Sequence, residues 1–223
     1  MKQLALLRVS FELRYPKFNV VEHSQMILDL FKDHSFGSMN ILNDELYLKN
    51  DSAEQMEVIV GTRRLLFIMH ACPDREYFIQ ILKTDLAKTF SIIKIPEISW
   101  IEVRGCHLYP IGVLEEFFEL VTALNEYNKM EFNDTGVSLH YSADHNLNVN
   151  ILFRHMTQEQ ARKYFHLTPE QLDVSQMYLG VDIDIWINEV INTQLPEQLT
   201  EFLNQTTRHM DQKLESILRL KPA

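Results

Sequence analysis

Glycine, proline and cysteine are all scarce in this sequence. Its 223 residues include 6 glycines, 7 prolines and 2 cysteines. Long flexible linkers are therefore not expected, and a glycine-rich loop that cradles phosphate has little material. The two cysteines, Cys72 and Cys106, are far apart and form no Cys-x-x-Cys motif. We expect two buried, reduced thiols.

Long apolar runs and an excess of positive charge are also missing. No run approaches the ~20 apolar residues of a membrane span, and charged residues interrupt the first 14 residues, unlike a signal peptide. The formal net charge of -10 repels a phosphate backbone, which argues against nucleic acid as a partner. We expect a cytoplasmic protein that does not associate with membranes. Apolar residues make up 46% of the chain, enough for a sizeable core.

The familiar catalytic signatures are absent as well. The sequence contains no nucleophile elbow, P-loop, dinucleotide-binding fingerprint or His-Glu-x-x-His motif. We therefore assign no catalytic residue and no cofactor. The sequence favours a binding protein over an enzyme without deciding between them.

The clearest positive signal is strict alternation between residues 178 and 187. Leucine, valine and isoleucine occupy every second position, and Asp182, Asp184 and Trp186 fall between them. This period of two predicts a half-buried β-strand with the two aspartates on its solvated face. A similar alternation over residues 4–15 predicts a second strand, which Pro16 ends.

The order of the predicted elements indicates the fold class. Strands are expected at 4–15, 41–48, 56–70 and 98–109, with Gly61 as a bulge, and helices at 20–34 and from Pro73-Asp74 to about residue 90. Beyond them we expect a helix at 112–129, a hairpin of 137–142 with 147–153, a short helix capped by Thr157, and the 178–187 strand. Both halves read strand, helix, strand, strand, helix, strand. We therefore predict an α+β fold of two tandem ferredoxin-like (βαββαβ) units with antiparallel sheets.

The predicted domain boundaries follow from this repeat. The first unit covers residues 1–110 and the second 98–190, so that they share the 98–109 strand, and residues 191–223 form a long C-terminal helix from Pro196 to Leu220. This helix either closes the core or pairs with another subunit. Its candidate protein-interface residues are Phe202, Met210, Leu214, Ile217 and Leu218.

Four residues are candidates for a metal site. Asp182 and Asp184 project from one face of a strand, and His140 and His145 lie in the predicted hairpin. Carboxylates and imidazoles bind divalent cations, although such a site requires several convergent ligands. The alternative is that all four are polar residues of solvated surfaces.

Three short motifs resemble an uncharacterised bacterial α+β family of about 220–260 residues. They are the strand Val9–Tyr15, the segment Gly105-Cys106-His107-Leu108-Tyr109, and the acidic strand Val181–Asp184, which is followed by a helix bearing His209. The resemblance implies a bacterial origin and no particular activity. The middle motif departs from the family, which usually has arginine before the tyrosine and asparagine soon after it. The chain is also similar to tandem ferredoxin-like CRISPR RNA-processing proteins, but it lacks their glycine-rich loop.

These observations favour a non-catalytic protein-binding or assembly subunit of a bacterial cytoplasmic system, such as an accessory component of a defence-type complex. It would bind a protein partner or form a homo-oligomer, through sheet edges or the C-terminal helix. The alternatives are a metal-dependent hydrolase or nuclease, and a single-stranded RNA-binding protein.

Overall fold

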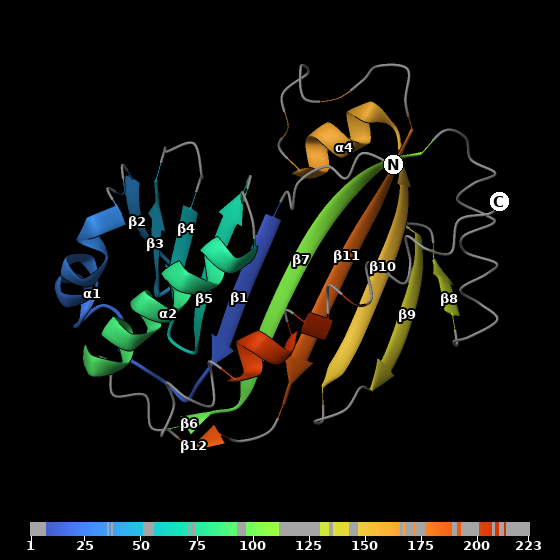
Figure 1. The fold of residues 1–223 in the computed structure, drawn as a ribbon. Coiled ribbons are helices and arrows are strands. Elements are labelled where there is room, and N and C mark those ends of the chain that lie inside the picture. Colours follow the sequence, from blue (N-terminus) through green and yellow to red (C-terminus); the bar gives the residue numbers. More distant parts are fainter. Residues whose placement is uncertain are drawn as a thin grey trace.

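The computed structural model describes residues 8–34, 36, 38–50, 56–70, 72, 75–92, 97–111, 130–133, 136–142, 147–165, 167, 172, 177–188, 191–192, 201–206, 208–209 and 212. Within these residues, ten strands form one antiparallel sheet in the order β2-β3-β4-β5-β1-β7-β11-β10-β9-β8 (Figure 1). The strands are β1 (Arg8–Arg14), β2 (Ser38–Leu42), β3 (Glu45–Lys49), β4 (Met56–Val60), β5 (Arg64–His70), β7 (Trp100–Ile111), β8 (Met130–Asn133), β9 (Gly136–Ser142), β10 (Asn148–Met156) and β11 (Met177–Ile187). Two short strands, β6 (Glu97–Ile98) and β12 (Ile191–Asn192), pair separately.

The prediction of two tandem ferredoxin-like units is wrong. A second unit beginning with β7 would place that strand between β10 and β11. Instead β7 lies between β1 and β11, and β11 pairs with β10 on its other side. The ten strands, with β2 at one end and β8 at the other, therefore form one continuous sheet. The sequence pattern gives the order of elements along the chain, whereas the fold depends on which strands become neighbours.

The predicted long C-terminal helix is also wrong. The described helical residues near the C-terminus are 201–206, 208–209 and 212. Phe202 and Leu203 are buried in the main core, and the Thr206 hydroxyl donates to the carbonyl groups of both. In Figure 1 these described residues (red) cross in front of β7 and β11. The apolar periodicity of this segment thus corresponds, at Phe202 and Leu203, to a face that is buried in the core.

Two predicted strands are in fact hairpins. The 41–48 stretch is divided between β2 and β3 by Asn43 and Asp44, which both have positive φ angles, 52° and 62°. That conformation is typical of the two-residue type I′ turn. The 56–70 stretch is divided between β4 and β5, and Gly61, predicted as a bulge, begins the turn between them. A Cβ atom at Gly61 would lie 2.7 Å from a carboxylate oxygen of Glu45, so a side chain there would displace this carboxylate, which is bound to Arg64.

The two faces of the sheet are covered differently. Helices α1 (Ser24–Phe31) and α2 (Arg75–Ile92), with a short 3₁₀ segment η1 (Lys32–His34), lie over one face of its N-terminal half (Figure 1). That inner face carries the main core, which includes Phe11, Phe67 and Phe31, the last two with ring centroids 5.9 Å apart. On the outer face, α4 (Gln158–Phe165) packs on Cys106 and Tyr178. The remainder of the outer face carries many polar side chains.

Several local predictions are confirmed. The 137–153 hairpin forms from β9 and β10, and the 178–187 strand is β11. Thr157 caps α4 as predicted, since its hydroxyl accepts from the Gln160 amide (3.2 Å) and its own amide donates to the Gln160 side chain (2.8 Å). Both cysteines are buried, and neither forms a disulfide. The predicted 112–129 helix lies outside the described residues.

Among the described residues, no helix is both long enough and apolar enough to cross a membrane.

Candidate functional site

β2 lies at one end of the ten-stranded sheet and pairs with β3. No described strand lies on its other side, so that side presents backbone N–H and C=O groups. The sequence of β2 is Ser-Met-Asn-Ile-Leu, without charge or proline. Met39 and Ile41 are each 49% exposed and Leu42 is 58% exposed. An uncharged, apolar edge of this kind is a template for pairing with another strand.

The β2–β3 register explains why this strand forms although its side chains are exposed. Met39 lies opposite Leu48 and Ile41 opposite Leu46, and both leucines are buried in the main core. Met39 and Ile41 therefore extend the inner, apolar face by one strand beyond its last buried row. The turn that positions β2 is held by the Thr62 hydroxyl, which donates to the carbonyl of Asp44 (3.2 Å).

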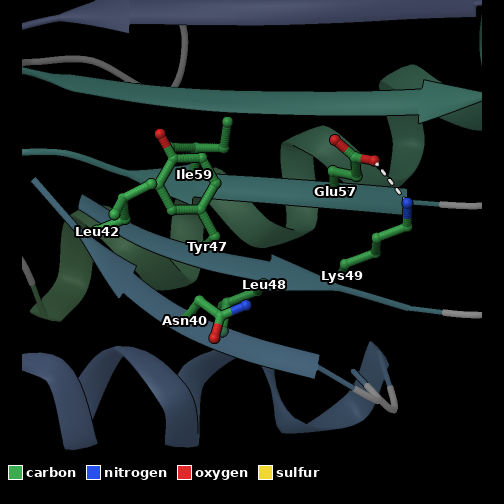
Figure 2. A pocket seen from close by; sticks show the side chains of 7 residues that line it. All are labelled: Asn40, Leu42, Tyr47, Leu48, Lys49, Glu57 and Ile59. Atoms are coloured by element: carbon green, nitrogen blue, oxygen red, sulfur yellow. Dashed lines mark ion pairs between the residues drawn. The ribbon is translucent and has the colours of Figure 1, made fainter.

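A shallow hollow of about 260 Å³ lies beside the edge strand. Figure 2 shows its lining, with Leu42, Tyr47 and Ile59 toward one end and the ion pair of Lys49 with Glu57 toward the other. The full lining is Asn40, Leu42, Tyr47, Leu48, Lys49, Glu57 and Ile59. A side chain of a bound strand that points to this face would find an apolar surface next to a charged one.

The charges at this hollow are paired within the chain. Lys49 Nζ lies 3.2 Å and His70 Nε2 lies 3.6 Å from Glu57 Oε1. The hydrogen bond from His70, assisted by Lys49, lowers the pKa of Glu57 to about 2 against the effect of burial. Glu45 is held by Arg64 through two hydrogen bonds of 2.8 and 2.9 Å. A partner would thus meet compensated charges here, which do not require a counter-charge.

Exposed apolar residues are concentrated at this end of the molecule. In the part of the chain that the structure describes, the exposed large hydrophobic residues are Val21, Met26, Met39, Ile41 and Leu42. The first two lie on or just before α1 and the others on β2, and Figure 1 shows both elements at the same end of the sheet. Concentrations of exposed apolar surface mark interaction sites more often than single exposed residues do.

Two of the predicted metal ligands, Asp182 and Asp184, lie on the outer face of β11 in a charged network. Asp182 is 4% exposed, and both of its oxygens accept hydrogen bonds from Arg104, one of them at 2.8 Å. It also accepts bonds from the Cys106 thiol (3.3 Å) and the Tyr164 hydroxyl (3.0 Å). The face that was expected to be solvated is therefore buried at Asp182, because α4 supplies Tyr164 above it.

The two aspartates have opposite pKa shifts. Burial alone would raise the pKa of Asp182, but the hydrogen bonds and charge of Arg104, with Cys106 and Tyr164, lower it. Asp184 lies 3.1 Å from Arg104 Nε and accepts a bond from Asn150 Nδ2 at 3.3 Å. Burial and the negative charge of Asp182 nevertheless raise its pKa to about 7. Asp182 is thus a fixed anion, whereas Asp184 can gain a proton near neutral pH.

The predicted histidine ligands do not complete this cluster. His140 is exposed on β9, opposite Asn150 of β10, and β10 separates it from the aspartates on β11. His145 lies outside the described residues. No group of three or more potential metal ligands occurs among the residues that are described. The metal site stays a prediction, and the observed contacts of Asp182 favour a structural ion pair.

The predicted interface residues of the C-terminal segment divide in the same way. Phe202 is 5% exposed and belongs to the main core. The four others, Met210, Leu214, Ile217 and Leu218, lie outside the described residues. Among the described residues, the exposed apolar surface lies instead on β2 and at α1.

The two tryptophans of the chain stack on each other across the outer face. The ring centroids of Trp100 and Trp186 are 5.7 Å apart with an interplanar angle of 18°, and the Arg14 guanidinium lies 4.9 Å from the Trp100 ring centroid. Proteins that bind single-stranded RNA present aromatic faces to the bases. Here ring faces of both tryptophans are occupied within the chain, so this observation does not favour the RNA-binding alternative.

A comparison of the chain with protein-family models and with curated proteins finds no match.

The sequence analysis predicts neither β2 as a separate strand nor a role for Arg104. The signal for β2 was the uncharged run Ser38–Leu42 before Asn43-Asp44, a dipeptide that suits a two-residue hairpin turn. Arg104 and Glu102 are two residues apart in a predicted strand, so their side chains share one face of it. The role of Arg104 depends on β11 being the neighbouring strand, which local periodicity does not reveal.

Proposed function

We propose that this chain is a non-catalytic binding protein that takes up an extended protein segment as an additional strand along β2. The observation that carries the proposal is that β2 is an uncharged apolar strand at the end of the sheet, with Met39, Ile41 and Leu42 exposed. Backbone groups of the edge supply affinity for any strand, and pockets for alternate side chains supply specificity. The hollow beside β2 is such a pocket on the outer face.

A buried charge network that consists of paired groups is consistent with this function. Asp182 accepts hydrogen bonds from three different side chains, which holds β7, β11 and α4 together. A carboxylate in that state is a poor general base because its lone pairs are already engaged. The network therefore contributes to a rigid sheet, and a rigid edge binds a strand with less loss of entropy.

The test is a selection of short extended peptides by the full-length chain. Enriched peptides should bind with hydrogen-exchange protection at the β2 amides, and Ile41→Lys should remove binding because it places a charge where an apolar contact forms. Ser142→Lys is the matched control, since Ser142 is an exposed strand residue on β9 and the added charge is the same. Binders that leave the β2 amides unprotected and that still bind the Ile41→Lys variant would contradict the proposal. A chain that neither enriches any peptide nor associates with itself would contradict it as well.

A further inference from the structure

We infer that the strand which pairs with β2 is β2 of a second copy of this chain, antiparallel and centred on Asn40. This inference rests on the proposed function and specifies its partner. In this register the five residues of the strand match the same five residues of the other copy in reverse order. Met39 then faces Ile41 of the second copy, Asn40 faces Asn40, and Leu42 faces Ser38.

The register joins like surfaces on each face of the sheet. Met39 and Ile41 lie beside Leu48 and Leu46 on the inner face, so the pairing of Met39 with Ile41 continues the apolar layer from one copy into the other. Asn40 and Leu42 line the hollow on the outer face. A side-chain amide can donate to and accept from the same group of the second copy, so the Asn40 pair satisfies itself across the twofold axis.

Charge does not oppose the pairing. β2 itself carries no charged residue, so the pairing buries none. On β3, Lys49 lies opposite Ser38 and Glu45 opposite Leu42, and these two residues mark the opposite ends of the strand. Both are paired within their own chain, Lys49 with Glu57 and Glu45 with Arg64, so neither end of β3 brings an uncompensated charge to the junction.

Symmetry separates this pairing from the other possible one. Joining β2 to β2 uses the same surface on both copies and closes the assembly as a dimer. Joining β2 to β8, the strand at the far end of the sheet, would leave one free edge of each kind and build an open ribbon. Val21, just before α1, and Met26, on α1, lie at the β2 end as well, so the exposed apolar surface of the described residues is concentrated at the edge that closes.

The first measurement is the mass of the full-length chain in solution, by sedimentation or light scattering over a micromolar concentration series. We expect a dimer that dissociates on dilution. Ile41→Lys should weaken the dimer about tenfold or more, because two lysines then enter one apolar row. Ser142→Lys should leave the dimer unchanged. Circular dichroism of both variants checks that the fold is retained, which we expect because residue 41 is half exposed.

The second measurement tests the register. Directly opposed residues of antiparallel strands have Cβ atoms about 4.5–5.5 Å apart, close to disulfide distance. Asn40→Cys should therefore give a disulfide-linked dimer on mild oxidation, since position 40 faces itself. Leu42→Cys alone should not, since position 42 faces Ser38. The native cysteines are both buried.

A monomer at every concentration would overturn the inference, as would a dimer that the Ile41→Lys variant retains. Cross-linking by Leu42→Cys but not by Asn40→Cys would also overturn it, and so would growth of the assembly beyond the dimer, which indicates β2–β8 pairing. The proposed function is tested separately. The chain could be monomeric and still bind peptides at β2, with binding removed by Ile41→Lys. That outcome would support strand addition and contradict only the pairing of two copies.

Discussion

Arg104 and Asp182 are bonded diagonally across the β7–β11 pair. The register places Arg104 directly opposite Asp184, and Asp182 directly opposite Cys106. The guanidinium nevertheless binds both oxygens of Asp182, and Asp184 receives the weaker contact at 3.1 Å. The guanidinium of Arg104 therefore contacts two carboxylates, and removing it should affect them differently.

Removing the cation should destabilise the fold strongly. With Arg104→Met, the buried Asp182 loses its counter-charge, and we expect a loss of about 3 kcal/mol at neutral pH. The loss should shrink as the pH falls toward 4, because protonation of Asp182 then relieves the uncompensated charge. Urea denaturation at several pH values measures this. Lys163→Met, in an exposed pair of α4 with Glu159, is the control and should cost less than about 1 kcal/mol. Equal losses for both variants would contradict the assignment.

The proton of Asp184 should make the stability of the chain depend on pH. Its pKa is 3.8 in the unfolded reference and about 7 in the fold. A raised pKa stabilises the fold fully below the lower value, and this contribution is lost as the pH rises through the upper one. The Asp184→Asn variant has no such proton. Its stability relative to the native chain should therefore increase between pH 4 and pH 7, by at most about 4 kcal/mol, and then level off. A difference that does not vary with pH would show that Asp184 is ionised throughout.

Phe202 should behave as a core residue. Phe202→Ala is expected to lower the free energy of unfolding by about 3–5 kcal/mol, the usual cost of truncating a buried phenylalanine. The assembly state of the folded fraction should not change, because this side chain packs within its own chain. Val21→Ala, at a residue that is 52% exposed, is the control for loss of an apolar group and should cost little. A variant with native stability and altered mass in solution would return Phe202 to the interface.

Divalent cations should not stabilise the chain. The oxygens of Asp182 are engaged by Arg104, Cys106 and Tyr164, so we expect the same Tm with and without added Mg²⁺, Mn²⁺ or Zn²⁺. Elemental analysis of the purified protein should find no stoichiometric metal. A rise in Tm with one of these ions, abolished by Asp184→Asn, would instead support the hydrolase or nuclease alternative.

Period-two patterns located most strands but not their ends or their partners. Residues 178–187 alternate strictly and do form β11. Residues 56–70 form two strands, β4 and β5, which are separated by a turn of three residues. The period-two pattern does not reveal this turn, because the stretches on both sides of Gly61 are apolar. Local chemistry was sufficient for the Thr157 cap, where one side chain and one amide decide the geometry.

The parts that could not be predicted are those that depend on long-range pairing. The prediction that Asp182 and Asp184 share one face was right, but the burial of Asp182 depends on α4, whose Tyr164 binds it on the outer face. In the same way, the exposure of β2 depends on its place at the end of the sheet, which local periodicity does not predict. A single sequence records which residues share a face of a strand, and it does not record what lies on that face or beside it.

The central position of β1 has a consequence for how the chain reaches its native state. Both neighbours of β1 follow it in sequence, and Arg14 must meet Arg64 on one side and Trp100 on the other. During synthesis β1 therefore emerges from the ribosome well before β7. The edge of β1 that pairs with β7 stays unpaired until about 90 further residues have been made. Contacts of such sequence separation slow folding, and the waiting strand is prone to mispair. Newly made chains should thus depend on chaperones more than their size alone suggests.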